Sequence, residues 1–330
     1  MDLIHTARSI IQHHIAPQPS WPPRDLSLAL QGGGSFGAFT WGVLDRLVEE
    51  RGLCFDTISG ASAGAVNAVL LASGLAEGGR DAAKEKLAQF WKRMSEAAAF
   101  MSLANAAQIP GIPGIAPTGL GMLTRALSPY QFNPLDLNPL RKALEAQVDF
   151  DRLRSESPVR LMIAATRISD GKLRIFRTED ISLEAVLASA CLPQLHRAVE
   201  IEGELYWDGG YVANPPLVRL VHESETSHIL VVQITPVKID HPPTTSGEIA
   251  KRVDQITFNS SLNSELDVLD LASEVAPSSK LKNLKMDRIA ADELVENLAE
   301  QSAADLDWPF LERLRGSGRI AADKWLRKRP

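Results

Sequence analysis

The most informative stretch of this chain for its fold is residues 55–64, Phe-Asp-Thr-Ile-Ser-Gly-Ala-Ser-Ala-Gly. The first five are rich in β-forming residues, and residues 63–73 are nearly all small or apolar, which predicts a short strand followed by a buried helix. Gly60 and Gly64 flank Ser62 in a Gly-x-Ser-x-Gly turn, where a tight backbone leaves no room for a Cβ atom. A strand, a sharp turn and a helix in this order expose a serine hydroxyl above the edge of a sheet, so Ser62 is a candidate nucleophile.

The chain before this turn shows another strand and helix. Leucine alternates with small or polar residues over 26–30, which predicts a strand that ends at a run of glycines. Beyond Gly37, apolar residues recur at helical spacing, with charged residues on the opposite side. The β-α-β-α order of residues 25–75 predicts a parallel sheet with a right-handed crossover and with its functional loops at the carboxyl ends of the strands.

The rest of the chain continues this alternation. The predicted strands are 159–167, 172–177, 204–207 and 228–234, the first two joined as a hairpin, and the predicted helices are 81–100, 137–148, 182–189 and one after Pro216. These patterns predict an α/β fold in which helices flank a mainly parallel central sheet.

Proline content and composition divide the chain into three regions. Residues 1–24 become dense in proline and are expected to form an N-terminal arm. Residues 25–240 are predicted to form the catalytic domain. Within it, the apolar segment 109–138 is either a lid over the active site or a loop folded over the core. Residues 241–330 are expected to be mainly helical, with a candidate strand at 282–289, and to pack on the same domain.

Composition sets limits on partners and location. The net charge of −6 gives no global reason to bind nucleic acid. The last twenty residues are basic, and they form either a contact for an anionic surface or the solvated face of a terminal helix. Cys54 and Cys191 form neither a disulfide framework nor a metal motif, and no residue pattern calls for a metal or cofactor. No secretion signal or membrane span is visible, so we expect a cytoplasmic protein, with peripheral membrane contact left open.

The glycine run supplies a second functional feature. An acyl-transfer nucleophile needs donors that face the developing oxyanion, and the backbone N–H groups of Gly32, Gly33 and Gly34 can supply them. A single β-α-β unit places this loop beside the turn at Ser62.

The same glycines also match a dinucleotide-binding pattern, Gly32-x-Gly34-x-x-Gly37. The acidic residue expected at the end of the second strand is missing, because Asp56 lies near the start of that strand. A nucleotide-binding or lipid-binding module, in which Ser62 is only a turn residue, is therefore kept as an alternative.

Serine must lose its proton as it attacks, so the site needs a base. Among the histidines, His196 is the best candidate, in a predicted loop. The sequence Trp-Asp-Gly-Gly offers another solution, because Asp208 ends a predicted strand and can accept the serine proton directly. Gly209 and Gly210 then allow close approach to another loop, although Asp-Gly-Gly by itself is a common turn.

Taken together, residues 32–37, 60–64 and 208–210 resemble the three signature blocks of the patatin-like phospholipase family. The similarity extends in order and spacing over about 25–235, and Asn214-Pro215-Pro216-Leu217 fits the family as well. The resemblance implies a three-layer patatin-like fold with a helical C-terminal extension. It also implies a hydrolase that cleaves acyl esters of lipids through an acyl-serine intermediate.

The resemblance also implies roles for individual residues. Ser62 is then the nucleophile, Asp208 its partner in a Ser-Asp dyad without histidine, and the glycine loop the oxyanion hole. The flanking glycines, Gly60, Gly64, Gly209 and Gly210, support these motifs. An acyltransferase with the same nucleophile is the alternative enzyme.

One position departs from the family pattern. Phe36 stands where the family commonly has arginine or lysine, and an aromatic ring brings no positive charge to an oxyanion or a lipid phosphate. We therefore expect a preference for less anionic acyl esters over anionic phospholipids.

Overall fold

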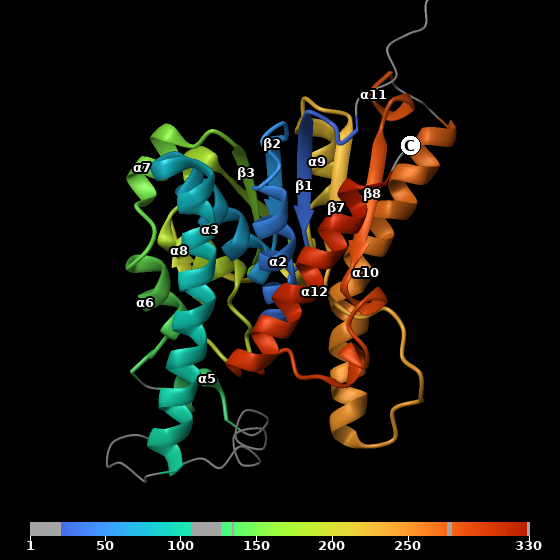
Figure 1. The fold of residues 1–330 in the computed structure, drawn as a ribbon. Coiled ribbons are helices and arrows are strands. Elements are labelled where there is room, and N and C mark those ends of the chain that lie inside the picture. Colours follow the sequence, from blue (N-terminus) through green and yellow to red (C-terminus); the bar gives the residue numbers. More distant parts are fainter. Residues whose placement is uncertain (1–20, 107–126, 134, 276–278, 329–330) are drawn as a thin grey trace, which may run out of the picture.

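A mixed sheet forms the centre of the molecule, which we describe from a computed structural model covering residues 21–106, 127–133, 135–275 and 279–328 (Figure 1). Within these residues eight strands form one sheet of order β5-β6-β3-β2-β1-β7-β8, with β4 paired to β3. The strands are β1 (Asp25–Leu30), β2 (Cys54–Gly60), β3 (Arg160–Arg167), β4 (Leu173–Arg177), β5 (Val199–Ile201), β6 (Glu204–Asp208), β7 (His228–Gln233) and β8 (Lys285–Ala290). The pairs that join β3, β2, β1, β7 and β8 are parallel, and the pairs that involve β4, β5 and β6 are antiparallel.

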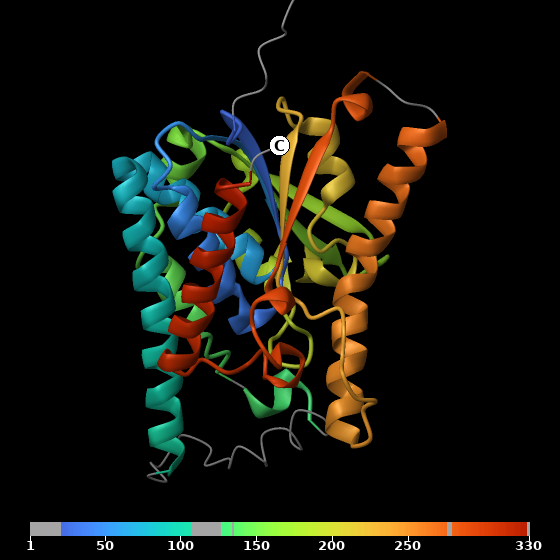
Figure 2. The same ribbon diagram turned by 45° about the vertical axis from the view of Figure 1, so that its right-hand side comes forward.

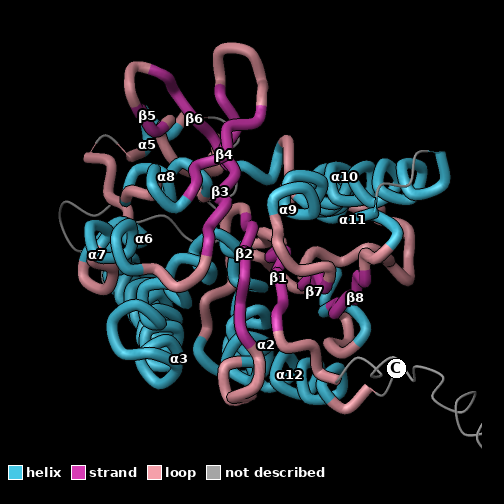
Figure 3. Tube along the Cα trace, turned by 90° about the horizontal axis from the view of Figure 1, so that it is seen from above, coloured by secondary structure: helices cyan, strands magenta, loops and turns pink. Residues whose placement is uncertain are grey.

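Helices cover both faces of this sheet. They are α2 (Gly37–Leu47), α3 (Ala63–Ala106), α5 (Pro129–Phe132), α6 (Pro139–Glu145), α7 (Phe150–Glu156), α8 (Leu183–Ser189), α9 (Leu217–Glu223), α10 (Ser246–Val275), α11 (Ser279–Lys282) and α12 (Trp308–Leu326). Figure 3 looks onto the ends of the strands and shows α2 and α12 on one side of the sheet and α9 and α10 on the other. This three-layer arrangement confirms the predicted fold class.

Alternation along β1 explains why two cores form. Leu28 and Leu30 belong to the main core, which the sheet shares with α2, α3 and α12. Ala29 points the other way, into a smaller core formed with α9 and α10. A strand that is apolar on both faces is what a buried parallel sheet requires.

The observed elements differ from the predicted ones in length and number. The two predicted helices at 63–73 and 81–100 are one element, α3, interrupted by non-helical backbone at Gly78 and Gly79. The helix predicted at 137–148 ends at Glu145 and is followed by the unpredicted α7. Both α7 and the three-residue β5 are too short to give a clear periodic pattern.

The C-terminal region completes the sheet and covers one face. Strand β8 pairs in parallel with β7. Helix α12 packs closely on α2, where a Cβ atom on Gly42 would lie 2.0 Å from the carbonyl oxygen of Arg315. The buried carboxylate of Asp45 on α2 binds Arg315 and Arg319 at 2.7 Å each. Two arginines of the basic C-terminus are therefore used inside the molecule, a role that neither sequence interpretation anticipated.

Several predictions fall on parts of the chain outside the described residues. These are most of the N-terminal arm and residues 109–126 of the lid-like segment.

Figures 1 and 2 show α3 and α10 extending beyond the sheet at the same end of the molecule. Among the described residues, no helix is long and apolar enough to span a bilayer.

Candidate active site

Ser62 occupies a strained turn between β2 and α3. Its φ angle of 53° lies in the left-handed region, which is costly for a residue with a side chain. Its N–H donates to the carbonyl oxygen and to the hydroxyl of Ser189, both at 3.1 Å. Ser62 is 7% exposed. A sharp strand-to-helix turn with the positive end of α3 directly behind the serine is the geometry that a nucleophile elbow requires, so Ser62 stays a candidate nucleophile.

The glycines around this turn allow close contact with neighbouring backbone. A Cβ atom on Gly64 would lie 2.1 Å from the carbonyl oxygen of Leu30, at the end of β1. A Cβ atom on Gly60 would lie 2.7 Å from the amide nitrogen of Ala65. Neither glycine can be replaced without moving backbone, which gives both of these motif positions a physical cause.

Asp208 ends β6 and is completely buried. Its Oδ1 accepts a hydrogen bond from the N–H of Gly210 at 2.8 Å. Its own backbone is held by Cys191, whose carbonyl accepts the Asp208 N–H at 2.8 Å, and by Thr166, whose hydroxyl donates to the Asp208 carbonyl at 2.7 Å. Among the described residues, Oδ2 has no hydrogen-bond partner.

Burial changes the acidity of this carboxyl group. It raises the pKa of Asp208 to about 7, against the lowering effects of the Gly210 N–H and of the Ser62 hydroxyl. The serine hydroxyl is thus close enough to influence the carboxyl, although Oδ2 itself is unpaired. Catalytic hydrogen bonds often tighten only when substrate is bound. A carboxyl with a pKa near 7 beside a candidate nucleophile suits a general base.

The glycine loop lies against the turn, as the β-α-β unit predicts, because β1 and β2 are neighbours. A Cβ atom on Gly32 would lie 2.7 Å from the Cβ atom of Ser62. The N–H of Gly32, however, already donates to Oδ1 of Asn214 at 2.7 Å. It is therefore not free to bind an oxyanion, which corrects the expectation that all three glycines offer their amides. The N–H groups of Gly33 and Gly34 bond no acceptor among the described residues.

The Asp-Gly-Gly turn is held tightly between β3 and α10. A Cβ atom on Gly209 would lie 2.2 Å from the carbonyl oxygen of Ala164. A Cβ atom on Gly210 would lie 2.6 Å from the ring of Phe258 on α10. The turn that carries Asp208 therefore depends on close packing on both sides.

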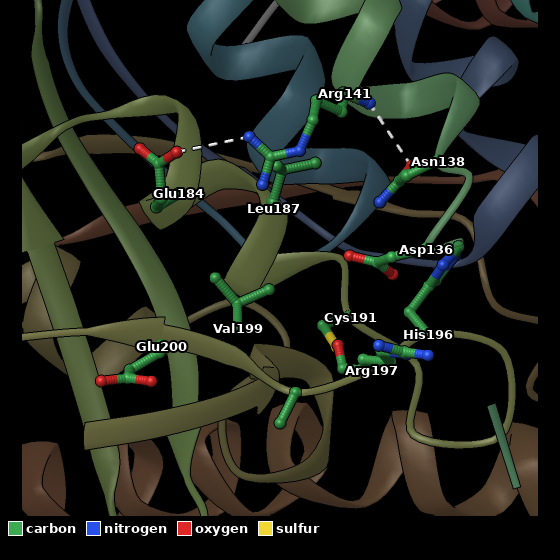
Figure 4. Close-up of a pocket in the computed structure, with 11 residues that line it drawn as sticks. Asp136, Asn138, Arg141, Glu184, Leu187, Cys191, His196, Arg197, Val199 and Glu200 are labelled. Carbon is green, nitrogen blue, oxygen red and sulfur yellow. Dashed lines mark hydrogen bonds and ion pairs between the residues drawn. The ribbon is translucent and has the colours of Figure 1, made fainter. Parts of the chain in front are cut away.

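His196 lies in a different environment (Figure 4). It borders a cavity of about 220 Å³ that neither Ser62 nor Asp208 lines. Burial lowers the pKa of His196, against the opposing effect of Asp136, and its Nδ1 has no partner among the described residues. Cys191 connects the cavity to the candidate site, because it lines the cavity and its carbonyl oxygen accepts the N–H of Asp208. The structure thus brings Ser62 and Asp208 together and leaves His196 apart.

Phe36, the position that departs from the family pattern, is part of the main core. Its ring packs edge-on against Phe310 of α12, with ring centroids 6.3 Å apart. The aromatic side chain at this position therefore helps to hold α12 against the core.

The residues that support these loops were not among the predicted site residues. Ser189 holds the elbow, Thr166 holds Asp208, and Asn214 holds Gly32. Asn214 was recognisable only as part of a family-like segment, and the two hydroxyl residues carry no sequence signal at all.

Among the described residues, no group of three or more histidine, cysteine or acidic side chains is arranged to hold a metal ion.

Comparison with known proteins places the chain in a family. The family model described as patatin-like phospholipase matches residues 28–221, which include the glycine loop, the elbow and the Asp-Gly-Gly turn. A cGAMP-activated phospholipase of Escherichia coli (strain TW11681) is 28% identical over 220 residues, covering 59% of this chain and 54% of the relative. The chain therefore matches about half the length of that protein.

Solved structures from two other bacteria match the chain at low similarity. VipD from Legionella pneumophila has a TM-score of 0.39 and 17% identity, covering 89% of this chain and 67% of that chain. The ExoU–SpcU complex from the type III secretion system of Pseudomonas aeruginosa has a TM-score of 0.37 and 16% identity, covering 93% of this chain and 52% of that chain. Because the family model matches more than half of the sequence, the chain belongs to the patatin-like phospholipase family.

Proposed function

We propose that this chain hydrolyses acyl esters of lipids with Ser62 as nucleophile and Asp208 as its base. One observation carries the proposal: a completely buried carboxyl, with a pKa raised to about 7, adjoins a serine in a strained turn. Strain at the serine and desolvation at the carboxyl are both costly, and such costs are concentrated at functional sites.

The mechanism uses one proton acceptor for both half-reactions. Asp208 takes the proton of the Ser62 hydroxyl as Oγ attacks the acyl carbonyl carbon. The resulting oxyanion accepts hydrogen bonds from the N–H groups of Gly33 and Gly34. Collapse of the intermediate breaks the ester bond, and the leaving alcohol takes the proton from Asp208. Water then attacks the acyl-serine, giving its proton to Asp208, and that proton returns to Ser62 as the fatty acid leaves.

The lipid part of the proposal is supported by family membership and by the name of the curated relative. Exposed apolar side chains also lie on helices α3, α5 and α10, among them Phe100, Tyr130, Ile249 and Val253. Peripheral membrane contact stays a prediction, which cosedimentation with neutral and anionic vesicles tests. The expected preference for less anionic esters also stays a prediction. Equal or faster hydrolysis of anionic phospholipids would contradict it.

The first experiment combines covalent labelling with ester hydrolysis. A fluorophosphonate probe should label the wild-type chain at Ser62, and the Ser62→Ala variant should not react. Both Ser62→Ala and Asp208→Asn should lower the hydrolysis of p-nitrophenyl esters by about a thousandfold or more while the thermal transition is retained. Full activity in Asp208→Asn would remove the aspartate from its role. A folded wild-type protein that the probe does not label would remove the catalytic proposal.

A further inference from the structure

Both backbone polar groups of Gly32 are held by side chains from outside the glycine loop. Its N–H donates to Asn214 Oδ1 at 2.7 Å. Its carbonyl oxygen accepts from Thr235 Oγ1 at 3.0 Å and from Asn214 Nδ2 at 3.4 Å. Asn214 follows the Asp-Gly-Gly turn, and Thr235 follows β7, so two separate segments converge on one glycine.

These bonds determine where the next amide points. The carbonyl of Gly32 and the N–H of Gly33 belong to one planar trans peptide, in which they point in opposite directions. Holding the carbonyl therefore also fixes the Gly33 N–H, which is one of the proposed oxyanion donors. Three consecutive glycines have wide backbone freedom and cannot hold this orientation by themselves.

The two side chains are themselves braced. Both Asn214 and Thr235 are buried. Asn214 Nδ2 also donates to the carbonyl oxygen of Phe258 on α10 at 2.9 Å. The backbone N–H of Thr235 donates to Gln31 Oε1 at 2.8 Å, and Gln31 Nε2 donates to Asn259 Oδ1, also on α10, at 3.0 Å. These hydrogen bonds connect the glycine loop to α10, a helix that lies outside the segment matched by the family model.

We infer that Asn214 and Thr235 are positioning residues that aim the Gly33 amide at the oxyanion. This inference rests on the proposed function and deepens it. Neither side chain takes part in bond making. Each acts through Gly32, and the predicted effect is on the chemical step more than on substrate binding.

The sharpest test uses a matched pair at Thr235. Thr235→Val keeps the shape of the side chain but removes the hydroxyl, and we expect it to lower kcat by about tenfold with little change in KM. Thr235→Ser restores the hydroxyl and should recover most of the lost kcat. Asn214→Ala removes both the acceptor and the second donor, so we expect a loss of about a hundredfold. If that variant fails to fold, the threonine pair still decides the question.

A second measurement separates positioning from general damage. Sulfur is a weak hydrogen-bond acceptor, so a site with well-aimed oxyanion donors hydrolyses an oxo-ester faster than the matching thiono-ester. The ratio of the two rates should fall in Thr235→Val and return toward the wild-type value in Thr235→Ser. Loss of stability alone does not change this ratio, because both substrates meet the same folded enzyme.

The control is a buried hydroxyl away from the glycine loop. Ser224 lies in the segment between α9 and β7, where its Oγ donates to the carbonyl oxygen of Leu220 at 2.7 Å. Ser224→Ala should lower the thermal transition temperature and leave both kcat and the rate ratio unchanged. Wild-type kcat and rate ratio in Thr235→Val would overturn the inference, as would an equal fall of both in Ser224→Ala. An inactive wild-type enzyme that the probe does not label at Ser62 would instead overturn the proposed function, and this inference with it.

Discussion

The structure prepares Ser62 and Asp208 for their proposed roles in opposite ways. The position of the Ser62 side chain is determined by its own backbone, which has a left-handed φ angle and closely packed glycines on either side. The acidity of Asp208 is determined by its surroundings, because complete burial raises its pKa to about 7. The proposed nucleophile therefore depends on a local turn, whereas the proposed base depends on residues that are distant in the sequence. Substitutions should therefore damage the two halves of the proposed dyad differently.

The largest effect is expected from Gly64→Ala, which acts on the nucleophile side. The new Cβ atom would lie 2.1 Å from the carbonyl oxygen of Leu30, and backbone cannot move aside as a flexible side chain can. We expect the free energy of unfolding to fall by about 3 kcal/mol or more, together with loss of ester hydrolysis. Thermal unfolding and a p-nitrophenyl ester assay measure both.

Gly316→Ala is the matched control for this prediction. Gly316 lies within α12, and a Cβ atom there would meet nothing within 4 Å. Because alanine favours helix more than glycine does, this variant should be as stable as the wild type or more stable by up to about 1 kcal/mol. Equal stability of the Gly64→Ala and wild-type proteins would mean that the turn is not closely packed against β1.

On the base side, Asp208→Asn should stabilise the fold while it removes activity. The pKa of Asp208 in the folded wild type is raised from 3.8 to about 7. Between pH 3.8 and pH 7, this carboxyl is therefore ionised in the unfolded state but still protonated in the folded state. The free energy of unfolding of the wild type therefore falls as the pH rises through this window and levels off above 7. Asparagine removes that loss.

We expect the stability gained by Asp208→Asn to be larger at pH 8 than at pH 5, by roughly 2–3 kcal/mol. Denaturant unfolding of both proteins at the two pH values measures the difference. A gain that is the same at both pH values would show that the carboxyl titrates normally, and the burial argument would then fail.

The same carboxyl predicts the pH dependence of catalysis. Asp208 must be ionised to accept the serine proton, so kcat/KM should rise about tenfold between pH 6 and pH 8, with a midpoint near 7. The ionisation of a carboxyl group has a small enthalpy, whereas that of an imidazole is large. The midpoint should therefore hardly move with temperature. A midpoint that falls steadily on warming would indicate a histidine base.

The local backbone of the candidate site could be predicted from the sequence. The strand-turn-helix around Ser62 and the position of the glycine loop beside it follow from residues 25–75, because neighbouring parallel strands place their carboxyl ends together. The residues that hold the loops of the candidate site in place could not be predicted in this way. The bond from Gly32 to Asn214 and the ring of Phe258 over Gly210 join residues that are far apart in the sequence, and no periodic pattern records such contacts. The engaged amide of Gly32 could not have been predicted for the same reason.

The smallest effect is expected at His196, which the sequence offered as the alternative base. Neither Ser62 nor Asp208 lines the cavity that His196 borders, and the carboxylate of Asp136 acts on the pKa of His196. A histidine that contacts neither reacting group can affect the rate only indirectly, so His196→Ala should leave kcat/KM within about twofold of the wild-type value. The pH midpoint near 7 should also persist in this variant, because it belongs to Asp208. A hundredfold loss of kcat/KM together with loss of the pH dependence would replace the dyad with a histidine-based triad and reverse the comparison drawn between its two halves.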